Sequence, residues 1–186
     1  MPAHVSDSAP PSGLRIRPAT AGDLPAITAL YASEVRDNVA TYEYDAPDQT
    51  EMQRRWQGVV AQGLPYLVAE LDGRFAGYAY ASSYRTREGY RWTVEDTVYV
   101  HPDYAGRGVG SALLRRLIDD CTALGLRQMV AVVGDITNVA SIALHEKFGF
   151  RTVGVFQGLG RKHDRWLDTV QMQLALGLGN ATAPDT

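Results

Sequence analysis

The residues best suited to chemistry lie between positions 93 and 111, where two acidic side chains precede a glycine-rich turn. Glu95 and Asp96 fall in an alternating polar and apolar stretch, which predicts a strand. The turn leads into an amphipathic helix, so it presents free backbone N–H groups of the kind that bind phosphate. The arrangement indicates an enzyme that binds a phosphorylated cofactor and removes a proton from a second substrate.

The elements around this motif alternate between strands and helices. Asp72 and Gly73, between two alternating runs, predict a hairpin. The order β-α-α-β-β-β-α-β-α-β-β predicts one α/β domain with a mixed central sheet and helices on both faces. Strands are expected at 14–17, 66–71, 75–82, 92–100, 129–133, 151–156 and 166–176, and the two later helices at 111–124 and 138–148.

Composition is typical of a soluble globular chain, with 45% hydrophobic and 21% charged residues among 186. A net charge of −3 argues against nucleic acid as a partner. The single cysteine, Cys121, excludes an intrachain disulfide and a cysteine-rich zinc site, and no metal site is predicted. No signal peptide or membrane span is recognised, which predicts a cytoplasmic protein. The domain is expected over 14–176, between flexible tails at 1–13 and 177–186.

Several stretches, in order, resemble the GNAT superfamily of acetyl-CoA-dependent N-acetyltransferases. They are YLVAELDGRFAGYAYAS, RTREGYRWTVEDTVYV, HEKFGF and GRKHDRW. Within the superfamily the chain is most similar to the phosphinothricin acetyltransferase family. This resemblance implies a GNAT-like domain, acetyl-CoA as co-substrate and direct acetyl transfer in a ternary complex. The implied acceptor is the primary amine of a small amino-acid-like molecule, such as phosphinothricin, methionine sulfone or methionine sulfoximine. A homodimer is also implied.

The resemblance assigns the acetyl-CoA site to the glycine-rich loop, the preceding strand and one asparagine. Ala105 departs from the family pattern, which has Arg or Gln there. The strand is expected to splay from its neighbour, with an N–H near Tyr99 or Val100 polarising the thioester. The alternative for the loop is a plain glycine-rich turn, and the alternative for the strand is ordinary pairing within the sheet. For Asn138 the alternative is a helix N-cap. The residues implied are Val98, Tyr99, Val100, Gly106, Arg107, Gly108, Val109, Gly110, Ser111 and Asn138.

Two residues are candidates for the catalytic proton transfers. Glu95 is expected to be the general base that deprotonates the amine, and it shares a strand face with Tyr99 by alternation. The alternative is a solvated strand residue. His145 replaces the Tyr common in the superfamily and is expected either to donate a proton to the departing thiolate or to be a structural helix residue.

Residues 84–92 are expected to recognise the acceptor. Arg85 and Arg87 suit a carboxylate, while Tyr90 and Trp92 would shape the side-chain pocket. A solvated hairpin loop is the alternative. His163 is expected to face the substrate or a subunit interface. Two other functions stay open: a GNAT enzyme for a polyamine, peptide N-terminus or antibiotic, and a non-catalytic acyl-CoA-binding module.

Overall fold

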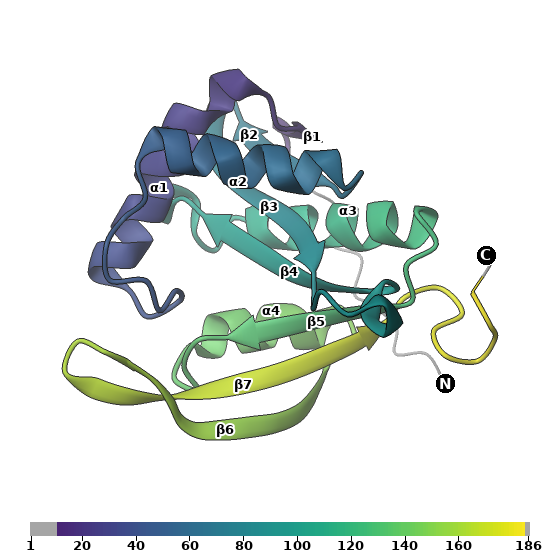
Figure 1. Cartoon of the computed structure of the whole chain (residues 1–186). Helices are drawn as coiled ribbons and strands as arrows, with labels where there is room; N and C mark the ends of the chain where they lie inside the picture. Colours follow the sequence, from purple (N-terminus) through teal and green to yellow (C-terminus); the bar gives the residue numbers. More distant parts are fainter. Residues whose placement is uncertain (1–10, 185–186) are drawn as a thin grey trace.

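The protein is described by a computed structural model that covers residues 11–184. Its strands form one mixed sheet in the order β1-β2-β3-β4-β5-β7-β6 (Figure 1). The strands are β1 (Leu14–Pro18), β2 (Tyr66–Leu71), β3 (Arg74–Ser83), β4 (Thr93–Val100), β5 (Gln128–Val133), β6 (Arg151–Lys162) and β7 (Arg165–Ala175). The helices are α1 (Leu24–Asp37), α2 (Gln49–Ala61), α3 (Val109–Ala123) and α4 (Val139–Lys147).

Each face of the sheet is covered by two helices, as the sequence predicts. On one face α1 and α2 bury residues such as Ile27 and Met52 against Tyr78 of β3. On the other face α3 buries Leu113 and Leu117, and the end of α4 adds aromatic residues to the same core. Only β4 and β5 are paired in parallel, and they join the two halves of the sheet. The function-bearing segment at 93–111 therefore lies at the centre of the fold.

The predicted order of elements is confirmed, and the main differences concern element ends. Asp72 and Gly73 form the expected hairpin turn, with φ values of 52° and 75°. The prediction that β6 ends at residue 156 is wrong, because the strand pairs with β7 as far as Lys162↔Arg165. Several glycines interrupt the alternating pattern there, so the sequence conceals the strand.

The proposed tail boundaries remain predictions. Positions 1–10 and 185–186, which belong to the expected tails, lie outside the described residues. Within 177–184 the chain returns to β5, where the Arg127 guanidinium donates to the carbonyls of Gly179 and Ala183. Among residues 11–184, no helix combines the length and apolarity needed to cross a bilayer.

Candidate active site

Strands β4 and β5 separate before either of them ends. Their parallel pairing stops at Glu95↔Val130, although β4 continues to Val100 and β5 to Val133. On its other edge β4 stays paired with β3 as far as Val100. The sheet therefore opens into a V-shaped gap, visible between β4 and β5 in Figure 1. The splayed strand that the sequence predicts is present and begins just beyond Glu95.

The register between β3 and β4 decides which backbone groups face this gap. His101 N–H donates to Ala76 O at 2.9 Å. Bonded and non-bonded residue pairs alternate along an antiparallel ladder, so odd-numbered residues of β4 bond to β3. The N–H and C=O groups of Val98 and Val100 therefore point toward the gap. The backbone of Tyr99 is bonded to β3, which leaves Val98 and Val100 as the available donors.

The glycine-rich loop lies beside the gap and has the backbone geometry of an anion cradle. Gly106 and Gly108 have φ values of 72° and 82°, a left-handed conformation that glycine adopts without strain. Helix α3 begins at Val109, two residues earlier than predicted, because Gly108 is its N-cap. The first intrahelical bond runs from Ala112 N–H to Gly108 O at 3.0 Å. The N–H groups of residues 109–111 thus have no partner inside the helix and suit a phosphate.

Two cationic side chains lie near the cradle, and they point differently. Arg107 stacks its guanidinium over Tyr104, 5.4 Å from the ring centroid, and does not line the cavity described below. Lys147 of α4 lines that cavity, and its Nζ donates to Ser111 Oγ at 3.3 Å. No local sequence pattern indicates a role for Lys147, because only the fold brings the end of α4 to the start of α3.

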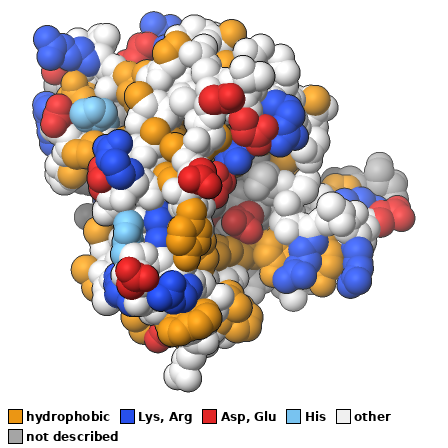
Figure 2. Space-filling view, turned by 60° about the vertical axis from the view of Figure 1, so that its left-hand side comes forward, with side chains coloured by type: hydrophobic (Ala, Val, Ile, Leu, Met, Phe, Trp, Pro, Cys, Tyr) orange, Lys and Arg blue, Asp and Glu red, His pale blue; other side chains and the backbone are white. Residues whose placement is uncertain are grey.

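A cavity of about 1030 Å³ occupies the gap and reaches both faces of the sheet. Glu34, Thr41 and Tyr42 line it from the α1 side, whereas the cradle and α4 line it from the other. Figure 2 shows acidic side chains beside the hollow. All predicted cofactor-binding residues except Arg107 line this cavity, and so do Glu95 and His145. One continuous space therefore connects the anion cradle with the predicted general base.

Glu95 lies at the apex of the gap and is half-buried. Burial raises the pKa of its carboxyl group, and the negative charge of Asp96 raises it further. The face assignment from alternation is confirmed, because Tyr99 packs with the α1–α2 core while Val94 and Asp96 are buried on the α3 side. A carboxylate with a raised pKa, on a cavity wall, suits proton abstraction from an amine.

His145 is buried, and both of its ring nitrogens have partners inside the protein. Nε2 lies 2.9 Å from Asp96 Oδ2, and Nδ1 lies 2.7 Å from Ser141 O. Burial alone would lower the pKa of His145. The hydrogen bond to Asp96, the negative charge of Asp96 and the hydrogen bond to the Ser141 carbonyl together outweigh the effect of burial, so the pKa is raised. Since no ring N–H is free, the geometry favours the structural alternative for His145 over the proton donor.

Asn138 serves as the N-cap of α4. Its Oδ1 accepts from Ser141 N–H at 3.2 Å, and the residue lines the cavity. Capping occupies the amide oxygen and leaves Nδ2 as a donor. The two uses expected for Asn138 are therefore compatible.

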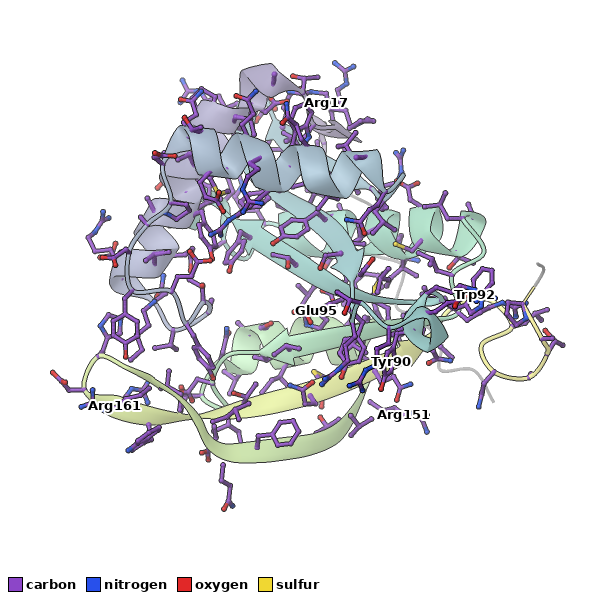
Figure 3. The ribbon with its side chains drawn as sticks, viewed as in Figure 1. Arg17, Tyr90, Trp92, Glu95, Arg151 and Arg161 are labelled. Atoms are coloured by element: carbon purple, nitrogen blue, oxygen red, sulfur yellow. The ribbon has the colours of Figure 1, made fainter. Side chains whose placement is uncertain are left out.

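The residues expected to recognise the acceptor do not line the cavity. Arg85 and Arg87 are exposed, and the Arg85 guanidinium lies 5.1 Å from the ring centroid of Tyr84. The Tyr84 ring meets that of Tyr90 edge-on at 5.7 Å. Figure 3 shows Trp92 at the outer end of β4, away from Glu95. None of the four residues lines the cavity, so their acceptor-binding role stays a prediction.

His163 lies in the turn between β6 and β7, with a φ of 47°. It is exposed there and lines a second cavity of about 500 Å³, with Arg36, Tyr44 and Arg161 among its neighbours. The structure therefore does not bring His163 together with Glu95. An interface role for His163 remains a prediction.

The segment between α1 and α2 supplies cavity residues that sequence reasoning missed. The Tyr42 hydroxyl donates to Gly134 O and lies 2.6 Å from Thr169 Oγ1. A Cβ at Gly160 would fall 2.4 Å from the Tyr42 ring, so the glycine makes room for it. The absence of a side chain at Gly160 is thus explained by the ring that packs against it. No local pattern reveals a contact between residues so far apart in the sequence.

Lys162 anchors this segment from β6. Its side chain is 2% exposed, and Nζ donates to the carbonyls of Asn38 and Thr41 at 2.7 and 2.8 Å. We expect Lys162→Met to lower the free energy of unfolding by about 2 kcal/mol, because two charge-assisted hydrogen bonds are lost. Since the loosened segment lines the cavity, the KM for the amine should rise about tenfold while the Kd of acetyl-CoA stays unchanged.

The control for this prediction is Arg161→Met, because the Arg161 side chain is exposed on the same strand and pairs with Asp164 in the adjacent turn, while its contact with the α1–α2 segment, from the Tyr44 hydroxyl, goes to its backbone carbonyl and is kept in the variant. Urea unfolding and initial-rate kinetics measure both variants. An unchanged amine KM in Lys162→Met would show that the anchored segment does not shape the acceptor site.

Comparison with known proteins agrees with this geometry. Residues 26–150 match the family described as "Acetyltransferase (GNAT) family". The chain is 52% identical over 163 residues to phosphinothricin N-acetyltransferase of Alcaligenes faecalis, covering 88% of this chain and 83% of the relative. It is 41% identical over 162 residues to an L-methionine sulfoximine/L-methionine sulfone acetyltransferase of Pseudomonas aeruginosa, covering 87% and 94%.

Among solved structures, the fold is similar to a phosphinothricin acetyltransferase of Sinorhizobium meliloti crystallised with AcCoA. The TM-score is 0.90 and the identity 46%, over 93% of this chain and 94% of the other. The likeness in sequence and in fold extends across the cradle, the gap and the helices around them. The chain belongs to the GNAT family of acetyltransferases.

Proposed function

We propose that this enzyme transfers the acetyl group of acetyl-CoA to the primary amine of a small amino-acid-like substrate, such as phosphinothricin, methionine sulfone or methionine sulfoximine. The observation that carries the proposal is the single cavity that joins the anion cradle to Glu95 through the gap between β4 and β5. The names of the relatives from Alcaligenes faecalis and Pseudomonas aeruginosa support this acceptor class.

The residues present fit acetyl-CoA. The N–H groups of residues 109–111 and the Lys147 ammonium would hold its phosphates. A Cβ at Gly110 would meet Val100 Cγ2 at 3.3 Å and Leu144 Cδ2 at 3.4 Å, so the lack of a side chain keeps the cradle close to the strand. When bound, acetyl-CoA supplies an activated thioester. The N–H groups of Val98 and Val100 would hold the pantetheine arm and polarise the acetyl carbonyl.

Glu95 would take a proton from the ammonium form of the acceptor, directly or through a water molecule. We propose direct attack of the resulting amine, without an acetylated enzyme. Cys121, the only cysteine in the sequence, is fully buried, and burial raises the pKa of its thiol to about 12. Such a thiol is a poor nucleophile at neutral pH.

A second candidate is a GNAT enzyme for a more basic amine, such as a polyamine. Glu34 and Glu95 both line the cavity, and Arg85 and Arg87 do not. An acidic wall favours a cationic acceptor, whereas an amino-acid analogue needs a cation for its carboxylate. A direct contact of Arg85 or Arg87 with the acceptor carboxylate in a complex would favour the first candidate.

We also propose a homodimer that acts in the cytoplasm. Apolar side chains of β6 and β7 are exposed, as expected for a surface covered by a second copy: Val153, Val155, Phe156, Leu159 and Trp166. A cytoplasmic location follows from the use of acetyl-CoA, which is an intracellular metabolite. Sedimentation equilibrium at micromolar concentration tests the dimer.

The test of the function is CoA release from acetyl-CoA with a panel of amines. The panel holds phosphinothricin, methionine sulfone, methionine sulfoximine, spermidine and a short peptide. Saturable release with the amino-acid analogues is expected. Release with spermidine alone would select the second candidate, and binding of acetyl-CoA without release on any amine would leave a non-catalytic acyl-CoA-binding module.

A further inference from the structure

A buried carboxylate and a buried imidazole face each other at the apex of the gap. Asp96 Oδ2 lies 2.9 Å from His145 Nε2, and the two side chains are 2% and 6% exposed. Asp96 is the first residue of β4 beyond the last pair with β5, and His145 lies in α4, which follows β5. The Asp96–His145 pair therefore links the two sides of the gap where they begin to separate.

The partners of the imidazole fix its proton count. The Ser141 carbonyl, 2.7 Å from Nδ1, can only accept, whereas the Ser141 hydroxyl lies farther from Nδ1, at 3.5 Å; Nδ1 of His145 therefore carries a proton that it donates to the carbonyl. An ionised Asp96 also only accepts, so one more proton must lie between Nε2 and Oδ2. Whether Nε2 or Oδ2 holds this second proton, the pair carries one proton more than a neutral imidazole beside an ionised carboxylate. An imidazolium–carboxylate ion pair is the form that the raised pKa of His145 supports.

The surroundings of the pair contain few other ionisable groups. Glu95 is the neighbour on β4, and the Cys121 thiol of α3 interacts with the charge of Asp96, whereas the adjacent Asp120 pairs with Arg116. The sequence of β5 over Gln128–Val133 has no titratable side chain. The edge of the Phe150 ring packs against His145, with the ring centroids 5.0 Å apart. Apolar packing around a charged pair makes the loss of either partner costly.

One oxygen of the carboxylate is left without a partner. Asp96 Oδ1 is fully buried and makes no hydrogen bond within the described part of the chain, although the residue lines the cavity. The His145 imidazolium is bonded to the other oxygen, Oδ2, and the charge of Asp96 still raises the pKa of its sequence neighbour, Glu95.

We propose that Asp96 is a positioning residue for acetyl transfer: with His145 it forms a proton-sharing clasp that fixes α4 against β4 at the apex of the gap, and it places a buried carboxylate next to Glu95, the proposed general base. The clasp sets the separation that exposes the backbone groups of Val98 to the cavity. The charge acts on the proton-accepting step. This inference rests on the proposed function in its second part only, because the clasp itself can be tested without turnover.

The clasp is tested by NMR of the histidine side chains, with the His145 signal assigned from His145→Gln. In the wild-type protein at pH 7 both ring nitrogens of His145 should show the chemical shifts of protonated imidazolium nitrogens. In Asp96→Asn the ring should titrate at lower pH, because its anionic partner is gone. A neutral His145 ring in the wild-type protein at pH 7 would overturn the clasp. This measurement stands even where Asp96→Asn does not fold.

The role in the reaction is tested by the pH profile of kcat/KM. Asp96→Asn should lower kcat/KM about 10–10²-fold, because α4 and β4 would no longer be held at the separation that positions the reacting groups. It should also move the acidic limb of the profile to lower pH, because a negative neighbour no longer raises the pKa of Glu95. Asp119→Asn, which removes one exposed carboxylate from α3, is the matched control.

A purely structural role predicts lower activity with an unmoved acidic limb, and that result would overturn the second part of the proposal. A profile of Asp96→Asn equal to that of Asp119→Asn would overturn it as well. If the wild-type protein acetylated no amine in the panel, the proposed function would fail. The imidazolium signal would then still decide whether the clasp exists.

Discussion

Glu95→Gln is expected to lower kcat/KM by about 10²–10⁴-fold, the usual contribution of a positioned general base. Glutamine keeps the size and the hydrogen-bonding oxygen of the side chain but cannot accept the proton of an ammonium group. Glu95 lies at the apex of the gap, whereas the loop proposed to hold the CoA phosphates begins at Gly106. The Kd of acetyl-CoA, measured by calorimetry, should therefore change less than about twofold.

The same residue predicts a pH dependence. Burial and the charge of Asp96 raise the pKa of Glu95, and the carboxylate is the form that acts as a base. The kcat/KM of the wild-type enzyme should therefore fall as the pH drops through this raised pKa. In Glu95→Gln this acidic limb should disappear, so that the two activities converge at low pH. Rates from pH 4.5 to 8 measure the effect.

Glu146→Gln is the matched control for Glu95→Gln. Glu146 is exposed on α4 and does not line the cavity. Its replacement should leave both the rate and the acidic limb unchanged. A wild-type acidic limb that persists in Glu95→Gln would assign the proton transfer to another group, and a large loss of acetyl-CoA affinity would point to a role in binding instead.

Much of the fold follows from local sequence patterns. The hairpin at Asp72 and Gly73, the strand at 93–100 and the helix after the glycine-rich loop each carry a short-range signal, and the order of elements then selects one arrangement. Alternation also assigns Glu95 and Asp96 to opposite faces of β4. These features depend on residues a few positions apart, where propensity and periodicity act directly.

The side-chain contacts that the sequence does not reveal join distant segments. Lys162 holds the carbonyls of Asn38 and Thr41, more than a hundred positions away in the chain. The Asp96–His145 bond likewise joins residues 49 positions apart. Such partners are set by the packing of the whole sheet and leave no periodic trace. The loop with Arg85 and Arg87 is the opposite case, a sequence signal that the structure does not place at the site. Its composition suits an anion, but its side chains are exposed and lie outside the cavity.

The resemblance to the GNAT superfamily indicates some of the site residues that local sequence patterns do not, but not all of them. It correctly directs attention to the strand and loop that line the cavity, from Val98 to Ser111. It does not indicate that Arg107 turns onto Tyr104 while Lys147 reaches the cradle. Side-chain direction depends on local packing, so each transferred residue has to be placed in the structure of this chain before a role is assigned to it.

Gly108→Val is expected to raise the Kd of acetyl-CoA about 10²-fold, or about 3 kcal/mol. Gly108 has a φ of 82° and caps α3, so a β-branched residue there must leave the left-handed region. The backbone shift would turn away the three N–H groups of residues 109–111. Each of these contributes up to about 1 kcal/mol to the binding of a phosphate.

Gly125→Val separates this effect from backbone strain. Gly125 follows the other end of α3, with a φ of 77° and open space around its Cα hydrogens, and it lies away from the cavity. Both variants should lose stability by similar amounts, of the order of 1–2 kcal/mol for a side chain in this conformation. Only Gly108→Val should lose acetyl-CoA affinity in calorimetry. If both variants bound acetyl-CoA as tightly as the wild-type protein, the phosphates would be held somewhere other than the start of α3.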